Sequence, residues 1–387
     1  MVHNTNDIIM KQGNTFNDKL YCTSPFNSLF IRPNGEVASC CAGTEPWGNL
    51  KENTIEEIIH SDIALRVRNN VLNANEDSYC DWCVHTENNS CFSQRRGFAH
   101  LDVDLNKEFE LKTLDIRWST ICNFSCIYCS EDWSSMWAHK KNLPVVSDNI
   151  KISEDILNYI EKNSEQIDSI MVAGGEPLLQ MQNEKLFDIL PNTTKILLIT
   201  NLGVDLKKSK IFKKLARYEI IDWAVSFENV GKQFEYVRHG GSWDLLVTNL
   251  KHIQDTTNHH VFTKSIFNVL TLFQLDELIT TMNDMNLDID WQMIADHDLC
   301  LNPLLYGGEI RNKMIYILEN VLNKEWKIDY GRDFLLSNLE NLKNNVGLNS
   351  KIDVNSNLLE FIKTQESLYN TTTHKFTELW PNLNELL

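Results

Sequence analysis

The chain lacks any long apolar run. None of its 387 residues falls in a window of about 18 consecutive apolar side chains, so we expect no transmembrane helix. Its first residues, MVHNTNDIIMKQGN, lack the basic segment and apolar stretch of a signal peptide. We therefore expect a cytoplasmic protein without membrane contact. In that reducing compartment, clustered cysteines are more often metal or cluster ligands than disulfides.

Positive charge is scarce. The chain has 36 Lys and Arg residues against 53 Asp and Glu residues, which gives a net charge of −17. This balance argues against a protein that wraps nucleic acid through phosphate contacts. One basic run is present, and we interpret it as the solvated face of an amphipathic helix. It consists of Lys207, Lys208, Lys210, Lys213 and Lys214.

Internal repeats and low-complexity linkers are also missing. With 42% hydrophobic and 23% charged residues, the composition is globular and excludes a wholly disordered or fibrous chain. The ten cysteines divide the chain. We predict a cysteine-rich module at 1–105, a middle domain at 106–306 and a cysteine-free tail at 307–387. Cys300 lies near the end of the middle domain. The six cysteines of the module are Cys22, Cys40, Cys41, Cys80, Cys83 and Cys91.

The middle domain alternates strand-like and helix-like runs. The predicted strands are 114–118, 170–173, 196–200, 221–227, 261–270 and 289–294. Helices are predicted at 153–162 with Ser153 as N-cap, and at 185–190, 242–254 and 275–285. This alternation predicts an α/β fold with a parallel sheet. Six units are too few for a closed eight-stranded barrel and favour a partial (β/α)6 TIM-type barrel.

The flanking segments have different patterns. In the module, Pro33-Asn34-Gly35 predicts a turn between two short strands. Thr54 and Glu57 fit a capping box, which predicts the start of a helix that runs through Val71. The module is therefore predicted to be α+β. The tail is predicted to be helical, with one apolar face between Met314 and Leu322, and Trp380 near the end suggests that it packs back on the protein.

Three cysteines follow the first predicted strand of the middle domain. Cys122, Cys126 and Cys129 form a C-x3-C-x2-C loop. Three thiolates on one loop can hold a [4Fe–4S] cluster and leave its fourth iron without a protein ligand. The alternative from spacing alone is a zinc site, for which His139 is the nearest downstream histidine.

A second motif makes the pattern specific. The second predicted strand ends in Gly174-Gly175-Glu176-Pro177. Together with the cysteine loop and the aromatic Tyr128, it resembles the radical S-adenosylmethionine (SAM) superfamily. The resemblance implies a [4Fe–4S] cluster and SAM as cofactors, with Tyr128 beside the adenine. Glycines allow close approach of the backbone to a ligand, and the carbonyls and Glu176 are expected to accept hydrogen bonds from the ammonium group of SAM.

Further segments resemble the family less closely. They are a Thr200-Asn201-Leu202-Gly203 turn, a Ser226-x-Glu228 strand end and an E-Y-x-R-x-G segment at 235–240. Leu202 replaces a family glycine, and Glu228 replaces an aspartate. The resemblance implies that SAM contacts come from Asn201, Ser226, Glu228, Arg238 and Asn268. The alternative for each of these residues is a strand-end cap or a surface side chain.

The N-terminal cysteines resemble the twitch or SPASM modules that carry auxiliary clusters in radical SAM enzymes. The resemblance implies one auxiliary [4Fe–4S] cluster and a position over the barrel mouth, where the module would shape the substrate site. The expected ligands are Cys22, Cys40, Cys80 and Cys83, with Cys41 and Cys91 as spare candidates. A structural zinc site on the same four thiolates is the alternative.

The resemblance implies reductive cleavage of SAM to a 5′-deoxyadenosyl radical, which removes a hydrogen atom from a substrate. That substrate is a peptide, a protein or a small molecule, and the reductant is a donor such as flavodoxin or ferredoxin. Two other functions stay open: a non-catalytic iron–sulfur or zinc protein for electron transfer or binding, and an RNA-modifying radical SAM enzyme. Cys300 is expected to be a buried apolar side chain, or else a hydrogen donor.

Overall fold

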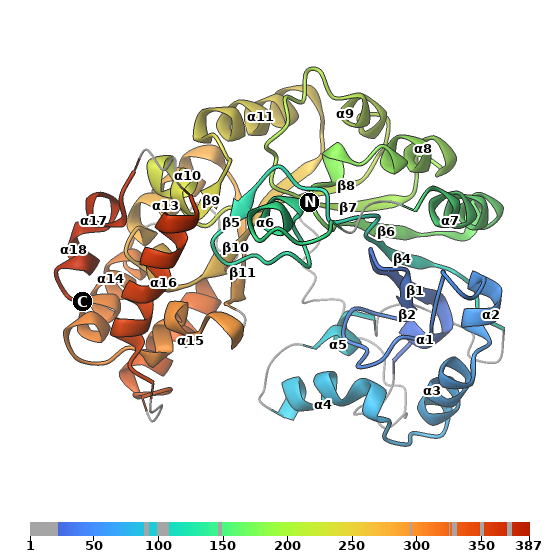
Figure 1. Ribbon diagram of the computed structural model, residues 1–387, viewed down its shortest axis with the longest axis horizontal. Coiled ribbons are helices and arrows are strands. Elements are labelled where there is room, and N and C mark those ends of the chain that lie inside the picture. The colour runs from blue at the N-terminus through green and yellow to red at the C-terminus, as the bar shows by residue number, and fades with distance from the viewer. Residues whose placement is uncertain are drawn as a thin grey trace.

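The computed structural model describes residues 22–88, 93–98, 108–145, 149–294, 296–324, 326, 331–348, 352–369 and 374–387. Its centre is a nine-stranded sheet in the order β11-β10-β8-β7-β6-β4-β1-β2-β3 (Figure 1). The strands are β1 (Ser28–Ile31), β2 (Glu36–Ala38), β3 (Gly48–Asn49), β4 (Thr113–Ile116), β6 (Ser169–Val172), β7 (Lys195–Thr200), β8 (Ile221–Val225), β10 (His260–Phe267) and β11 (Asp288–Met293). A second sheet joins β5 (Ser125–Cys126) to β9 (Arg238–His239).

Six strands form the parallel part of the large sheet. Each neighbouring pair from β4 through β6, β7, β8 and β10 to β11 is parallel. This arrangement confirms the predicted α/β fold and is that of a partial TIM-type barrel. Between the strands run α7 (Ile150–Asn163), α8 (Gln182–Ile189), α9 (Lys210–Leu215), α10 (Gly231–Val237), α11 (Trp243–Thr256), α12 (Val269–Leu272) and α13 (Leu275–Met285).

The two faces of the sheet differ in burial. Along β7, Ile196, Leu198 and Thr200 are buried, whereas Leu197 and Ile199 between them are half-buried. The same two-residue period recurs along β10. Helices α7, α8, α9 and α11 pack along one side of the sheet (Figure 1). A parallel sheet is normally covered on both faces, so a face that stays half-buried lacks part of its cover. We therefore interpret the half-buried face as the open inner side of the partial barrel.

The N-terminal module continues the barrel sheet. Strand β1 pairs in parallel with β4, with Ile31 opposite Ile116. Strands β2 and β3 then extend the edge in antiparallel fashion, and Gly35 in the predicted turn has φ 88°. The module is therefore joined to the barrel through the sheet edge. Its helices are α1 (Ser24–Asn27), α2 (Ile55–Ile59), α3 (Asp62–Leu72), α4 (Asp81–Asn88) and α5 (Gln94–Phe98), with the 3-10 turn η1 (Ser78–Cys80).

Several predicted boundaries were wrong. The capping box of Thr54 and Glu57 is confirmed, but the helix that it starts ends at Ile59, because Ser61 caps a new helix by accepting from the backbone N–H of Ala64 at 3.3 Å. Helix α7 starts three residues before Ser153, and its N-cap is Asn149. The strand predicted to reach residue 270 ends at Phe267.

The C-terminal tail is helical, as predicted. It contains α14 (Gly308–Leu322), α15 (Arg332–Lys343), α16 (Val354–Leu368), α17 (Phe376–Leu379) and α18 (Pro381–Asn384). Trp380 returns to the barrel, where its indole Nε1 donates to the Leu270 carbonyl at 3.0 Å. Within the described residues, no helix combines the length and apolarity needed to cross a bilayer.

Candidate functional site

The three-cysteine loop leaves the carboxyl end of β4 and is held at several points. Cys126 pairs with Arg238 in the β5–β9 ladder. Helix α6 (Ser135–Lys140) follows the loop, and its Trp137 indole donates to the Cys126 carbonyl at 2.8 Å. The Ser134 hydroxyl donates to the Phe124 carbonyl at 2.7 Å. The sequence thus folds into a loop whose backbone is fixed on both sides.

The three thiols face a common space. Burial raises the pKa of Cys122 to about 12, and the neighbouring Cys126 adds to that rise. Burial likewise raises the pKa of Cys129 to about 12, with contributions from Cys126 and Cys122. Each pair of the three therefore interacts electrostatically. Neighbouring thiols that burial, and then their mutual interaction, keep protonated are suited to a shared positive centre, which binds them as thiolates.

Two N–H groups point at these sulfurs. The Asn201 amide donates to Cys122 Sγ at 3.7 Å, and the Arg238 guanidinium donates to Cys126 Sγ at 3.7 Å. Such donors stabilise sulfur ligands and tune the centre that they hold. The predicted residues Asn201 and Arg238 are thus brought to the cysteine loop, as neighbours of the sulfurs.

Arg238 is held in place by a buried ion pair. Its Nη2 lies 2.6 Å from Glu228 Oε2 and its Nε lies 3.1 Å from Glu228 Oε1, and the Glu228 side chain is fully enclosed. The Tyr128 hydroxyl donates to the same carboxylate, and the guanidinium carbon lies 5.4 Å from the Tyr128 ring centroid. The structure therefore pairs Glu228 with Arg238, and its direct contact to SAM stays a prediction.

The two-glycine turn packs directly on the cysteine loop. Gly174 and Gly175 have φ values of 82° and 50°, which favour glycine. A Cβ at Gly175 would lie 2.1 Å from the Ile121 carbonyl oxygen, so no larger residue fits there. The backbone N–H of Glu176 donates to that oxygen at 2.7 Å. The two predicted motifs, on neighbouring strands β4 and β6, therefore meet at the same edge of the sheet.

Glu176 accepts hydrogen bonds within the protein, and its expected contact to the ammonium group of SAM stays a prediction. Its carboxylate is fully buried and accepts from the Thr200 hydroxyl at 2.7 Å and from the N–H groups of Asn201 and Leu178 at 2.7 and 3.0 Å. Burial raises its pKa to about 7. We interpret Glu176 as the residue that joins the ends of β6 and β7. The buried Pro177 opens the 3-10 turn η3 (Pro177–Leu179).

The other residues expected to contact SAM, and the turn residue Leu202, lie in different settings. Ser226 is half-buried at the end of β8, where its N–H donates to the Thr200 carbonyl at 2.8 Å. Leu202 takes φ 54°, the conformation for which the family carries glycine. Asn268, by contrast, is a helix cap: its amide oxygen accepts from the N–H groups of Leu270 and Thr271 at 2.8 and 3.1 Å. This is the strand-end cap that the sequence left open as the alternative, and its contact to SAM stays a prediction.

Four N-terminal cysteines form a second group. The pKa of Cys22 is raised first by burial and then by Cys40, Cys80 and Cys83. Burial, Cys40 and Cys83 raise the pKa of Cys80 to about 12, and Cys83 raises that of Cys40. Every pair within the group therefore interacts, which makes it a set of four possible thiolate ligands.

The spare cysteines differ from these four. The pKa of Cys41 is raised to about 11 by burial, then by Asp115 and by Cys40, and Arg117 lowers it. Its thiol thus lies near the end of β4 and interacts with one member of the group of four. Cys91 lies outside the described residues. Cys300 is buried, as expected for an apolar side chain.

The donor types of the two groups fit iron–sulfur clusters. Each group consists of cysteine thiols, three in the loop and four in the N-terminal module, and thiolates are the usual protein ligands of such clusters. Within the described part of the chain, no three His, Cys, Asp or Glu side chains are arranged to hold a single metal ion.

Some residues of the site were missed by sequence reasoning. The Tyr369 hydroxyl donates to the Ser125 carbonyl, and its ring stacks on His239 at 4.0 Å between centroids. Nothing in the sequence links the tail to a loop 244 residues away. The bond of Trp137 to the Cys126 carbonyl likewise has no signal in the sequence.

Comparison with known families decides the assignment of the barrel. Residues 116–285 match the model of the radical SAM superfamily. This chain carries a radical SAM domain. Residues 22–85 match the SPASM model, described as an iron-sulfur cluster-binding domain. A radical SAM domain uses a [4Fe–4S] cluster and SAM, and a SPASM domain binds auxiliary iron–sulfur clusters, so the predicted cofactors are confirmed.

Solved structures of radical SAM proteins are similar at low identity. They include anSMEcpe with bound AdoMet (14% identity, TM-score 0.40, 55% of this chain and 59% of that chain). SuiB of Streptococcus suis bound to S-adenosylmethionine has 16% identity and a TM-score of 0.38 over 54% of this chain and 44% of that one. Methylornithine synthase has 12% identity and a TM-score of 0.33 over 71% and 85%. The chain thus spans about half the length of the first two. No curated protein sequence matches significantly.

Proposed function

We propose that this radical SAM enzyme removes a hydrogen atom from a peptide or protein side chain, with SAM and a [4Fe–4S] cluster held at the carboxyl ends of β4 and β6. One observation carries the proposal. The thiols of Cys122, Cys126 and Cys129 face a common space directly beside the turn of Gly174 and Gly175. Three thiolates leave a four-iron cube one iron short of protein ligands, which is the position that SAM needs.

When bound, the cluster and SAM supply a one-electron cleavage that yields the 5′-deoxyadenosyl radical. The chain's own residues hold and shield this chemistry. Arg238 and Asn201 donate N–H groups to the sulfurs, and Glu228 keeps Arg238 charged and oriented in an enclosed space. The glycine turn packs against Arg117 and Ile121, which holds it directly beside the cysteine loop.

The N-terminal module is proposed to hold one auxiliary cluster on Cys22, Cys40, Cys80 and Cys83. Four thiolates complete the protein ligation of a four-iron cube, so this site has no open iron. Cys22 and Cys83 are buried and Cys40 and Cys80 are half-buried, and the Tyr79 hydroxyl beside them accepts from the Ser39 N–H at 2.9 Å. Metal binding at this site contributes folding free energy to a module that has only short strands.

The open inner face of the sheet is proposed as the substrate space. It presents half-buried apolar side chains, among them Met171, Leu197 and Phe262. At one edge, Lys264 Nζ lies 2.7 Å from Asp290 Oδ2 on the neighbouring strand, and both side chains are partly exposed. A surface that offers apolar contacts and both charges suits a peptide better than a small apolar molecule.

The test is anaerobic. The protein is loaded with iron and sulfide, mixed with SAM and dithionite, and assayed for 5′-deoxyadenosine by mass spectrometry. We expect 5′-deoxyadenosine, and we expect faster formation when a substrate peptide is added. A deuterium label on the reacting carbon of that peptide should appear in the 5′-deoxyadenosine. A fully loaded protein that neither changes its EPR signal with SAM nor cleaves SAM would instead be an electron carrier.

A further inference from the structure

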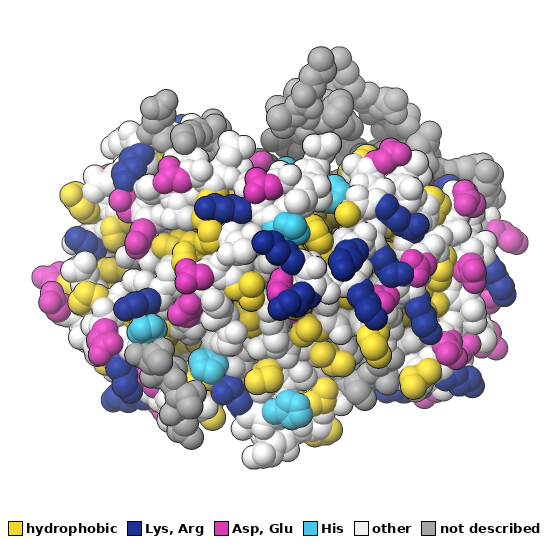
Figure 2. Space-filling view, turned by 90° about the horizontal axis from the view of Figure 1, so that it is seen from above, with side chains coloured by type: hydrophobic (Ala, Val, Ile, Leu, Met, Phe, Trp, Pro, Cys, Tyr) yellow, Lys and Arg dark blue, Asp and Glu magenta, His cyan; other side chains and the backbone are white. Residues whose placement is uncertain are grey.

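A basic surface stands out on this acidic chain. Residues 206–218 contain six Lys and Arg residues and no Asp or Glu, although the whole chain has a net charge of −17. Figure 2 shows Lys and Arg side chains gathered on the face that carries α8, α9 and α11. The sequence pattern alone predicts a solvated helix face. The position of this helix in the fold adds a pocket beside it.

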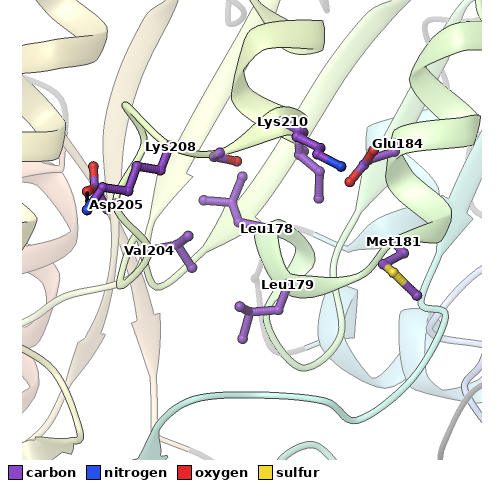
Figure 3. A pocket seen from close by; sticks show the side chains of 10 residues that line it. Leu178, Leu179, Met181, Glu184, Val204, Asp205, Lys208 and Lys210 are labelled. Atoms are coloured by element: carbon purple, nitrogen blue, oxygen red, sulfur yellow. Dashed lines mark ion pairs between the residues drawn. The ribbon is translucent and has the colours of Figure 1, made fainter.

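A pocket lies beside the lysines. It has a volume of about 220 Å³ and lies between the start of α8 and the start of α9. Leu178 and Val204 lie in its middle, and its rim carries Lys208 and Lys210 together with Asp205 and Glu184 (Figure 3). Met181, which also lines it, is 76% exposed, an unusual exposure for a large apolar side chain. The surface thus combines an apolar centre with a charged rim, and the exposed Lys207 and Lys213 on the adjoining loop and helix add positive charge to it.

Some of these lysines form ion pairs within the chain, and others do not. Lys208 pairs with Asp205 at 3.1 Å, and Lys214 pairs with Asp188. Lys207, Lys210 and Lys213 are exposed and form no ion pair with a described residue. The rim therefore carries excess positive charge, and the overall negative charge of the chain does not cancel it locally.

The pocket wall is connected to the cysteine loop. Val204 directly follows the Asn201–Gly203 turn. In that turn, the Asn201 amide donates to Cys122 Sγ at 3.7 Å, and the Gly203 carbonyl accepts from the Asn123 amide at 2.9 Å. On the other wall, Leu178 donates its N–H to the buried Glu176 beside Cys122. The surface therefore lies one layer of residues behind Cys122.

We infer that this surface docks an acidic electron-transfer protein such as a flavodoxin. The inference rests on the proposed function, which requires one electron from outside the chain. The donor's reduced flavin gives up that electron and becomes oxidised by one electron, and no proton or group is transferred. Charge complementarity selects the donor, and the exposed Met181 with Leu179 supplies the apolar contact. An RNA would require a wider basic surface than one short helix and its preceding loop.

The test compares two triple variants of the loaded, full-length protein. In the patch variant, Lys207→Glu, Lys210→Glu and Lys213→Glu reverse the rim. In the control variant, Lys151→Glu, Lys162→Glu and Lys363→Glu make the same change in net charge at exposed positions on α7 and α16. All six side chains are exposed, so both variants should keep the thermal transition and iron content of the wild type.

Binding and rate are then measured with reduced flavodoxin as probe. In the patch variant, we expect the dissociation constant for flavodoxin and the KM for flavodoxin in 5′-deoxyadenosine formation to rise about tenfold or more, and in the control variant less than about twofold. Wild-type binding should weaken between about 50 and about 300 mM salt, while the patch variant should lose this dependence. With dithionite, which needs no docking, all three proteins should cleave SAM equally.

Each failure has its own meaning. Equal flavodoxin binding by the patch and control variants overturns the docking surface and leaves the radical SAM function intact. Absence of 5′-deoxyadenosine with dithionite in the wild type contradicts the proposed function itself. A tRNA shift at about 150 mM salt that is lost only in the patch variant, with flavodoxin kinetics unchanged, would assign the surface to RNA and overturn the proposal.

Discussion

The two cysteine groups of this chain resemble each other in one respect and differ in another. Each has a carboxylate–arginine pair beside its thiols: Glu228 with Arg238 near Cys126, and Glu87 with Arg95 near Cys83. The loop group, however, has three thiols and two side-chain N–H donors directed at sulfur. The N-terminal group has four mutually interacting thiols. The pairs supply positive charge to both groups, and the number of thiols separates an open site from a closed one.

This difference shows which contacts hold each group of cysteines in place. The loop is fixed by bonds from distant elements, such as Trp137 to the Cys126 carbonyl. It can therefore keep its shape while one side stays open to a ligand. The N-terminal group bridges three segments of a module with short strands, so its ligands contribute to the fold itself. We expect variants of the two groups to fail in different ways.

The largest effect is expected for Cys126→Ala. Losing one of only three thiolates removes the cluster, so 5′-deoxyadenosine formation should fall at least about a thousandfold, below detection in the anaerobic assay. The matched control is Cys300→Ala, since Cys300 is buried away from both groups and should retain activity. A Cys126→Ala protein that still makes 5′-deoxyadenosine would contradict the assignment of the loop.

The next effect concerns the four-thiol group. Cys83→Ala should reduce the iron content from about eight to about four per chain and lower the thermal transition of the module, because its ligands hold three segments together. Cys41→Ala serves as control and should leave the iron content unchanged, since Cys41 interacts more strongly with Asp115 than with Cys40. Equal iron loss in both variants would place Cys41 among the ligands.

A third comparison weighs the two ion pairs. Glu228→Gln leaves the buried Arg238 without its partner and should cost about 3 kcal/mol of unfolding free energy. Glu87→Gln, at a carboxylate with 12% side-chain exposure, should cost about 1 kcal/mol. Urea unfolding monitored by tryptophan fluorescence measures both. The reverse order would show that the loop pair is the less important one.

The smallest effect lies far from both groups. His260 contacts Asp222 and Asp288 at 2.9 and 3.3 Å, and the hydrogen bond to Asp222, followed by that to Asp288, raises its pKa. Its protonated form is favoured in the folded state. The stability that it adds is therefore present below its ordinary pKa of about 6.5 and lost as the pH rises through the raised value.

His260→Gln tests this by urea unfolding between pH 5.5 and 8.5. Because the ring is 53% exposed, the wild-type advantage should be only a few tenths of a kcal/mol at low pH and should vanish at high pH. An advantage that grows with pH would contradict the direction of the shift. SAM cleavage should not change, since the residue lies at the opposite end of the strands from the cysteine loop.

Part of this arrangement was predictable from sequence. The six barrel strands are apolar runs between turn signals, and the cysteine loop and glycine turn follow two of them directly. Strand order and motif position then place the two motifs at one edge of the sheet. The resemblance to twitch or SPASM modules implied the four N-terminal ligands, and in the structure these four thiols interact with one another.

The rest depends on contacts that no local pattern encodes. The donors to Glu176 come from Thr200 and Asn201 on the next strand, so its enclosure cannot be read from Gly-Gly-Glu-Pro. Asn268 directly follows β10, and the sequence predicted that the strand continues through it. In the structure it caps a helix instead, because its side chain accepts hydrogen bonds from the first backbone N–H groups of α12. The addition of β1 to the barrel edge links residues about 85 apart, which is a long-range pairing.

One measurement tests the central claim, that the three-thiol group is open and the four-thiol group is closed. EPR spectra of the reduced, fully loaded protein are recorded with and without SAM, for the wild type and for Cys126→Ala. We predict two cluster signals in the wild type, of which SAM changes one, and in the variant a single signal that SAM leaves unchanged. A variant whose remaining signal still responds to SAM would contradict the account.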